Sequence, residues 1–236
     1  MKVVILAGGF GTRLSEYTDS IPKPMVPIAG IPIIEHIMNH YSNYGHNEFF
    51  IALGYKGEVI KNYFKNSKKK NWNIHLIDTG SDTLTGGRLK RLESYLNKES
   101  FLLTYGDGIS DININDLIQF HKNHKKIVTI SAVRPPARFG SLSLDGSNVL
   151  KFKEKTQLGE SWINGGFFVI NPNFFKFLEG DSSALEKKPL ETVTKLGEIR
   201  AFRHEGFWQC MDHKLDKDYL EQLVLDKKAP WILKNS

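Results

Sequence analysis

Apolar positions along the first 134 residues follow two alternating patterns. Short, mostly apolar runs predict strands at 2–6, 48–53, 72–78, 101–104 and 127–133. Between them, apolar residues recur at helical spacing and predict helices over 32–44, 57–65, 88–97 and 114–122. Strands that alternate with helices are typical of βαβ units. We therefore expect a Rossmann-like α/β fold with a mostly parallel mixed sheet flanked by helices.

The pattern changes after Pro135 and Pro136. Short segments separated by turn residues predict antiparallel strands at 141–144, 149–153 and 166–170. Helical spacing returns near 174–178, 190–196 and 215–225. No long linker or internal repeat interrupts the chain, so we expect a single domain over 1–236 whose C-terminal portion is smaller, antiparallel and helical.

The composition indicates the size of the hydrophobic core and the sign of the net charge. The 236 residues are 40% hydrophobic and 25% charged, which is sufficient for one sizeable core and argues against disorder. The formal net charge of +6 attracts anionic partners, among them phosphorylated small molecules. The lysine-rich run at 65–70 lacks interleaved aromatic residues, so we interpret it as a solvated loop and expect no nucleic-acid partner.

Cysteine content and the amino terminus bear on the compartment. Cys210 is the only cysteine, which excludes an intrachain disulfide and suits a reducing environment. The apolar run near the amino terminus is too short for a signal peptide or a membrane span. We expect a cytoplasmic protein without a membrane partner. Cys210 lacks a base partner in the sequence, so we interpret it as structural rather than nucleophilic.

The chemistry begins in the run LAGGFGTR at 6–13, which follows the first predicted strand directly. Glycines at 8, 9 and 11 permit positive φ and bring backbone N–H groups close to an anion. Arg13 and Lys23 supply positive charge for a triphosphate. The prolines on both sides of Lys23 hold it in an extended conformation. The spacing matches neither a P-loop nor a dinucleotide fingerprint, and it predicts another kind of nucleotide-binding loop.

Further motifs follow along nearly the whole chain. They are PKPM at 22–25, TG at 79–80, TLTGGRLKR at 83–91, TYGDG at 104–108, INGGFF at 163–168, GFWQ at 206–209 and MD at 211–212. Together they resemble the signature of sugar-phosphate nucleotidylyltransferases, in particular the glucose-1-phosphate cytidylyltransferases. The resemblance implies a GT-A-like fold, with a nucleotide-binding core at 1–134 and an acceptor-side and C-terminal part at 135–236. It also implies transfer of CMP from CTP to a sugar 1-phosphate, with release of pyrophosphate.

The same resemblance assigns site residues. It gives catalytic roles to Arg13 and Lys23, and the coordination of Mg²⁺ to Asp107 and Asp212. It places Glu154, Lys155 and Asn164 at the acceptor. The nucleotide-binding residues that it implies are Leu6, Ala7, Gly8, Gly9, Gly11, Thr12, Arg13, Lys23, Thr83, Arg88, Gly106 and Asp107.

Simpler structural roles stay open for several of these residues. Asp107 suits a turn, and Asp212 suits the cap of the helix that follows it. Thr85 suits a helix N-cap, which would leave Arg88 and Arg91 in solvent. A non-sugar phosphate acceptor, a catalytically inactive nucleotide-sensing homologue and a homo-oligomer also stay open as alternatives.

Overall fold

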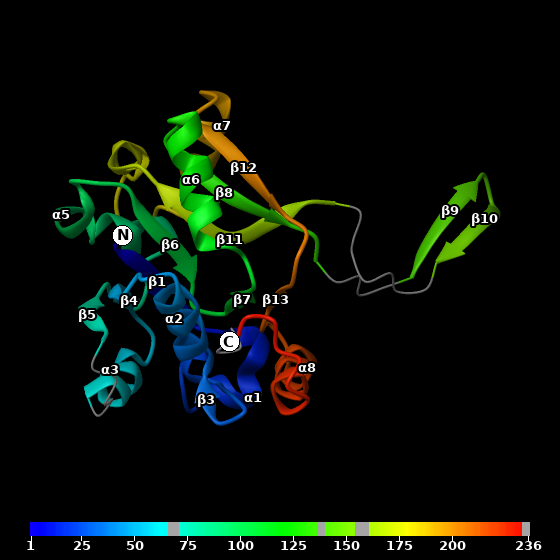
Figure 1. The fold of residues 1–236 in the computed structure, drawn as a ribbon, viewed down its shortest axis with the longest axis horizontal. Helices are drawn as coiled ribbons and strands as arrows, with labels where there is room; N and C mark the ends of the chain where they lie inside the picture. The colour runs from blue at the N-terminus through cyan, green and yellow to red at the C-terminus, as the bar shows by residue number, and fades with distance from the viewer. Residues whose placement is uncertain (66–70, 136–139, 154–160, 233–236) are drawn as a thin grey trace.

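The computed structural model describes residues 1–65, 71–135, 140–153 and 161–232. Its centre is a seven-stranded sheet in the order β12-β8-β11-β6-β1-β4-β5 (Figure 1). The strands are β1 (Val3–Ala7), β4 (Glu48–Leu53), β5 (Asn73–Asp78), β6 (Phe101–Tyr105), β8 (Val128–Val133), β11 (Ile163–Ile170) and β12 (Ile199–His204). Every pairing is parallel except those of β11, which runs antiparallel to β6 and to β8. The expected mostly parallel mixed sheet is confirmed.

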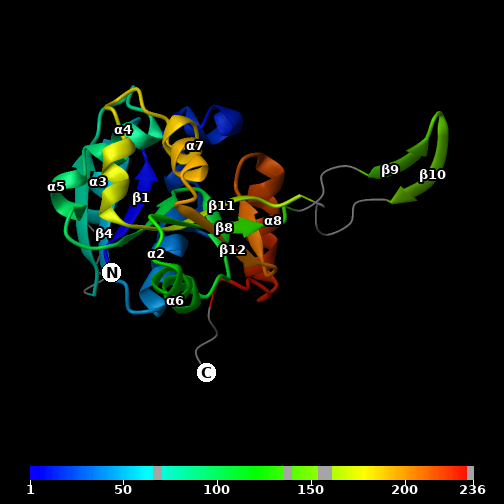
Figure 2. The same ribbon diagram turned by 90° about the horizontal axis from the view of Figure 1, so that it is seen from above.

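Both faces of the sheet are covered by helices (Figure 2). Side chains of β1 alternate between two apolar clusters, with Val3 and Ile5 in one and Val4 and Leu6 in the other. The first cluster includes side chains of α2 (Ile33–Asn43), α3 (Gly57–Lys65) and α6 (Ile114–His124). The second includes side chains of α4 (Thr85–Lys90), α5 (Glu93–Leu96) and α7 (Lys188–Lys195). The alternation fixes the register of β1, and with it the point where the glycine loop leaves the sheet.

The remaining elements complete the fold. They are η1 (Thr12–Leu14), α1 (Ser15–Thr18), η2 (Lys23–Met25), β2 (Pro27–Ile28), β3 (Ile31–Pro32), β7 (Gly108–Ser110), β9 (Ser141–Asp145), β10 (Asn148–Lys153), η3 (Pro172–Phe177), β13 (Trp208–Cys210) and α8 (Lys214–Leu225). The β9–β10 hairpin stands away from the central sheet in both ribbon views (Figures 1 and 2). An antiparallel ribbon of β7 and β13 pairs Cys210 with Gly108. This ribbon brings together two segments about a hundred residues apart in the chain.

Two predicted helices differ in the structure, and several strands were not predicted. The helix expected over 88–97 is two short helices, α4 and α5, and the first begins at Thr85. A Cβ on Gly87 would lie 2.5 Å from Asp181 Cα, so the glycines of α4 permit a close backbone approach that apolar spacing does not encode. The helix expected near 174–178 is the 3-10 helix η3. Finally, the strands β2, β3, β7, β12 and β13 were not predicted.

Two observations bear on the predicted partners. Within the described ranges, no helix is both long enough and apolar enough to cross a membrane. Residues 66–70 of the lysine-rich run lie outside the described residues. Their interpretation as a solvated loop stays a prediction.

Candidate active site

A cavity of about 580 Å³ opens where β1 and β6 end. In open α/β sheets, ligands bind in this position, beyond the carboxyl ends of parallel strands. The lining includes these residues predicted from the sequence: Leu6, Ala7, Gly8, Gly9, Gly11, Thr12, Arg13, Lys23, Thr83, Arg88, Gly106, Asp107, Asn164 and Asp212. Glu154 and Lys155 lie outside the described residues. Of the predicted set, all the members that the structure describes therefore meet in one cavity.

The glycine loop that follows β1 takes the left-handed conformation at one position. Gly11 has φ of 67°, and a Cβ there would lie 3.0 Å from the Lys23 Cβ. Gly8 and Gly9 do not have positive φ, so of the three glycines only Gly11 uses this conformational freedom. At Gly8 the missing side chain serves close packing instead, because a Cβ would lie 2.2 Å from Arg88 Nη1.

Arg88 occupies that space and is only 4% exposed. Its Nη2 donates to the carbonyl oxygens of Gly8 at 2.9 Å and Ser81 at 3.1 Å. Its Nη1 donates to the carbonyl oxygens of Leu53 at 3.0 Å and Gly80 at 2.7 Å, and to the hydroxyl of Thr79 at 2.8 Å. One guanidinium thus joins the glycine loop to the end of β4 and to the loop before α4.

This network rules out the alternative in which Arg88 is solvated. Thr85 is not the N-cap of α4 either, because that position is Leu84. Arg91, the C-cap of α4, is exposed and pairs with Asp181 at 2.6 Å. Arg88 lines the cavity and also fixes the shape of the loop. Sequence reasoning did not find the second role, since its acceptors come from separate parts of the chain.

Two carboxylates and two cations meet on the opposite side of the cavity. Lys23 Nζ lies 2.6 Å from Asp107 Oδ2 and 2.6 Å from Asp212 Oδ1. Arg13 Nη1 lies 2.6 Å from Asp212 Oδ2. Burial by itself lowers the pKa of Lys23, but Asp107 and Asp212 outweigh it and raise the pKa to about 12. Lys23 is therefore a fixed positive charge at neutral pH.

Asp212 directs its carboxylate into this cluster and does not cap the next helix. The N-cap of α8 is His213. Burial raises the pKa of Asp212, but hydrogen bonding by Lys23 and the charges of Lys23 and Arg13 hold it below its ordinary value of 3.8. Asp107 does lie in a turn, between β6 and β7, and it contributes its carboxylate from there. Asp107 is therefore both a turn residue and a member of this cluster.

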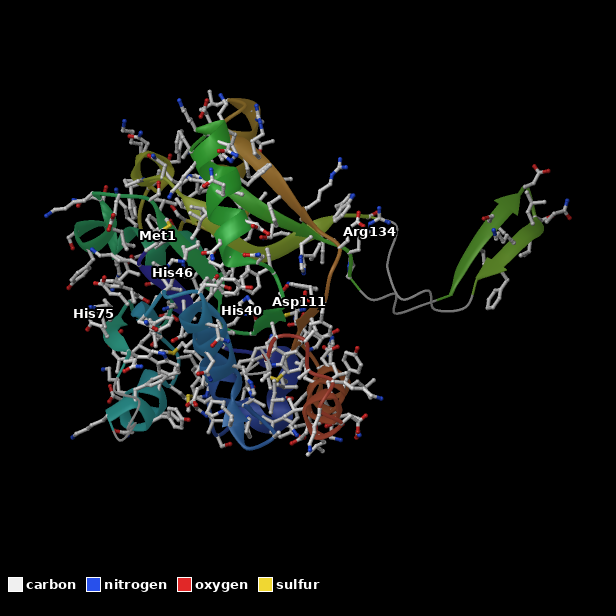
Figure 3. The ribbon with its side chains drawn as sticks, in the orientation of Figure 1. Met1, His40, His46, His75, Asp111 and Arg134 are labelled. Atoms are coloured by element: carbon white, nitrogen blue, oxygen red, sulfur yellow. The ribbon has the colours of Figure 1, made fainter. Side chains whose placement is uncertain are left out.

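The ribbon that carries both carboxylates is anchored from behind. Ser110 Oγ donates to the Phe207 carbonyl at 2.7 Å, and His40 Nε2 donates to the Ile112 carbonyl at 2.9 Å. Asp111 Oδ1 lies 2.9 Å from His204 Nε2. Figure 3 shows Asp111 beside β7, with His40 close to it on α2. These contacts hold Asp107 and Asp212 on a fixed backbone.

The donor set beside Lys23 fits a divalent cation. One ligand atom each from Asp107, Asp212 and Cys210 lies within 4.8 Å of the others. Carboxylate oxygens are the protein ligands that Mg²⁺ takes, usually one or two with several waters. Lys23 Nζ occupies the space between the two carboxylates here. A divalent cation would take that space once the ammonium turned toward a phosphate.

Tyr105 was not predicted as a site residue. Its hydroxyl donates to Glu186 Oε1 at 2.6 Å and accepts from Asn164 Nδ2 at 3.3 Å. Thr85 Oγ1 donates to the other oxygen of Glu186 at 2.7 Å. Burial, followed by the charge of Glu186, raises the pKa of Tyr105, so the hydroxyl stays protonated. The position of Tyr105 two residues before Asp107 was an available signal, whereas nothing in the sequence indicated Glu186.

Comparisons with known proteins agree with this geometry. Residues 2–204 match the family model described as Nucleotidyl transferase. The chain is 47% identical over 253 aligned positions to a glucose-1-phosphate cytidylyltransferase of Salmonella typhi, covering 98% of each. It is 42% identical to a probable glucose-1-phosphate cytidylyltransferase of Bacillus subtilis, covering 90% of this chain and 91% of that one. The structure of HddC from Yersinia pseudotuberculosis is 26% identical, with a TM-score of 0.78, covering 94% of this chain and 99% of HddC.

Proposed function

The chain belongs to the nucleotidyl transferase family, and from this premise we propose that it transfers CMP from CTP to glucose 1-phosphate. The products are CDP-glucose and pyrophosphate. The observation that carries the proposal is the meeting of Lys23 and Arg13 with Asp212 in a cavity that the glycine loop also lines. The names of the relatives at 47% and 42% identity support the choice of CTP and glucose 1-phosphate.

The reaction needs no strong general base. A phosphate monoester has a second pKa of about 6, so glucose 1-phosphate is largely dianionic at neutral pH. One of its oxygens forms a bond to the α-phosphorus of CTP. The bond from that phosphorus to the bridging oxygen of the β-phosphate breaks, and pyrophosphate leaves with the electron pair. The task of the protein is to align two anions and to stabilise the charge that develops.

Residues on both sides of the cavity hold the triphosphate in this proposal. Backbone N–H groups of the glycine loop face the phosphates, and Arg13 contacts them with its planar guanidinium. Lys23 binds the α-phosphate, where the negative charge increases in the transition state. Thr83, Arg88 and Gly106 line the part of the cavity that receives the cytidine.

Asp107 and Asp212 hold the Mg²⁺ of this proposal. A divalent ion held there would supply positive charge for the triphosphate oxygens and for the leaving pyrophosphate. The protein contributes the anchored ribbon, which sets the distance between the two carboxylates. If Lys23 and Arg13 turned toward incoming phosphates, Asp107 and Asp212 would lose these cationic partners and would be free to hold a divalent ion.

The acceptor lies near Asn164, on β11. Asn164 Oδ1 accepts from the backbone N–H of Gly166 at 2.8 Å, and its Nδ2 donates to Tyr105. Tyr105 and Glu186 thereby fix the orientation of the amide. Glu154 and Lys155 are proposed as further acceptor residues on the family resemblance alone.

Pyrophosphate release tests the proposal directly. Each of the four ribonucleoside triphosphates is supplied with Mg²⁺ and, in turn, with glucose 1-phosphate, other sugar 1-phosphates and non-sugar phosphate monoesters. We expect CTP with glucose 1-phosphate to give the highest kcat/KM. Preference for another acceptor would contradict the assigned sugar, and no release with any pair would favour the inactive nucleotide-sensing homologue.

A further inference from the structure

Cys210 places a sulfur atom beside the two carboxylates of the proposed cation site. It is the last residue of β13 and lines the cavity. Its Sγ and one oxygen each from Asp107 and Asp212 all lie within 4.8 Å of one another. Sequence reasoning treated this thiol as structural. Its position in the cavity places it beside two carboxylates with which it can share a divalent cation.

The backbone fixes this arrangement. Cys210 pairs with Gly108 across the ribbon, and the Met211 N–H donates to the Asp107 carbonyl at 2.9 Å. Cys210 thus ends one strand of the ribbon, Asp107 directly precedes the other strand, and Asp212 follows Cys210 by two residues. The site does not depend on a long flexible side chain to bring the sulfur to the carboxylates.

The space between the carboxylates already accepts positive charge. Lys23 Nζ contacts Asp107 and Asp212 at 2.6 Å each, and the side chain of Lys23 is 12% exposed. A cation that replaced the ammonium would meet two carboxylate oxygens and could draw in the neighbouring sulfur. Mg²⁺ takes oxygen ligands and gains little from sulfur, whereas thiolate selects softer ions such as Zn²⁺ and Cd²⁺.

We propose that Cys210 is a third, sulfur ligand of the divalent-cation site, which therefore binds thiophilic divalent cations more tightly than Mg²⁺ in the absence of CTP. This inference rests on the cation site of the proposed function. On binding, the thiol proton leaves to solvent, the thiolate and two carboxylates coordinate the ion, and the Lys23 ammonium moves away. No electrons are transferred. Such an ion competes with Mg²⁺ for the site that CTP uses.

Cadmium is a suitable probe because a cadmium–thiolate bond absorbs in the ultraviolet. Cys210 is the only cysteine, so any such band belongs to it. Titration of the full chain with Cd²⁺ and no nucleotide should give the band with one ion bound per chain. Cys210→Ser should abolish the band and lower the Cd²⁺ affinity by at least roughly tenfold, or about 1.4 kcal/mol. Thermal unfolding of the variant checks that it is folded.

Carboxylate variants distinguish Cd²⁺ bound by Cys210 together with the two carboxylates from Cd²⁺ bound by the thiol alone. Asp107→Asn and Asp212→Asn should each weaken Cd²⁺ binding, whereas Asp218→Asn should leave it unchanged. Asp218 is on α8 and pairs with Lys214 at 3.2 Å. Equal Cd²⁺ affinity in wild type and both site variants would overturn the inference, as would the absence of the band in wild type.

The inference and the proposed function fail separately. Pyrophosphate release by wild type with Mg²⁺ and CTP tests the function without cadmium. Turnover without a cadmium–thiolate band would keep the function and remove Cys210 from the cation site. A band that depends on both carboxylates, without turnover on any substrate pair, would keep the cation site and remove the proposed reaction.

Discussion

The two sides of the cavity are held together by different interactions. On the β1 side, the buried guanidinium of Arg88 donates to backbone oxygens, Gly8 O among them, and to the hydroxyl of Thr79. On the ribbon side, Lys23 and Arg13 pair with the side chains of Asp107 and Asp212. Backbone contacts of the first kind form when the chain folds and need not change on binding. Ion pairs of the second kind must rearrange, because the same cations are proposed to bind phosphate.

The largest effect should come from removing the ammonium on the ribbon side. Lys23→Met keeps most of the side-chain volume and removes the charge at the α-phosphate. We expect kcat to fall by about 100- to 1,000-fold, with a smaller change in KM for CTP. Steady-state pyrophosphate release measures both. Lys61→Met is the matched control, since Lys61 pairs with the exposed Glu58 on α3, outside the cavity. Unchanged kcat in Lys23→Met would remove Lys23 from the catalytic step.

On the β1 side, removal of the Arg88 guanidinium should destabilise the folded conformation of the glycine loop. Arg88→Met leaves the carbonyl oxygens of Gly8 and Ser81 without this donor. We expect a loss of about 3 kcal/mol in the free energy of unfolding, together with weaker CTP binding. Urea unfolding and CTP titration measure the two effects. Arg91→Met, at the C-cap of α4, should cost less than about 1 kcal/mol, because its pair with Asp181 is at the surface. Similar losses in both variants would contradict the role of Arg88 in fixing the shape of the glycine loop.

A smaller effect is expected from removing the Tyr105 hydroxyl, which lies beside the proposed acceptor position. Tyr105→Phe removes the hydroxyl that donates to Glu186 and accepts from Asn164. One such hydrogen bond contributes about 1 kcal/mol, so KM for glucose 1-phosphate should rise about fivefold while KM for CTP stays the same. Tyr95→Phe, at an exposed position on α5, serves as the control. A change confined to CTP would place Tyr105 on the nucleotide side.

The part of the fold that the sequence predicted well is the part specified by local pattern. The apolar run before the glycine loop, and the helix opened by Pro32 and followed by Gly45, are each set by residues close together in the chain. The strand Glu48–Leu53 and the helix Gly57–Lys65 have the predicted bounds. The match to the Nucleotidyl transferase model confirms the resemblance inferred from the motifs.

Features that depend on distant segments were not predictable in this way. The ribbon strands β7 and β13 have three residues each, too few for an alternating pattern to appear. Without that pairing, nothing places Cys210 beside Asp107. Arg88 gathers oxygen acceptors from Gly8 through Ser81, and helical spacing alone did not distinguish it from the exposed Arg91. The site residues came from the family motifs, whereas their mutual support came from tertiary structure.

The smallest effect should appear in the pH dependence of stability, and it sharpens the contrast between the two sides. The pKa of Asp212 in the folded chain lies below its ordinary value of 3.8, because Lys23 and Arg13 outweigh the effect of burial. Its stabilising contribution is therefore present above pH 3.8 and is lost as the pH falls through the lowered pKa. The difference in unfolding free energy between wild type and Asp212→Asn should stay constant down to about pH 4 and shrink as the pH falls further. The corresponding difference for Arg88→Met should stay constant over that range, since backbone carbonyls do not titrate. Parallel pH profiles for the two variants in urea unfolding would mean that the ribbon side is not held by charge.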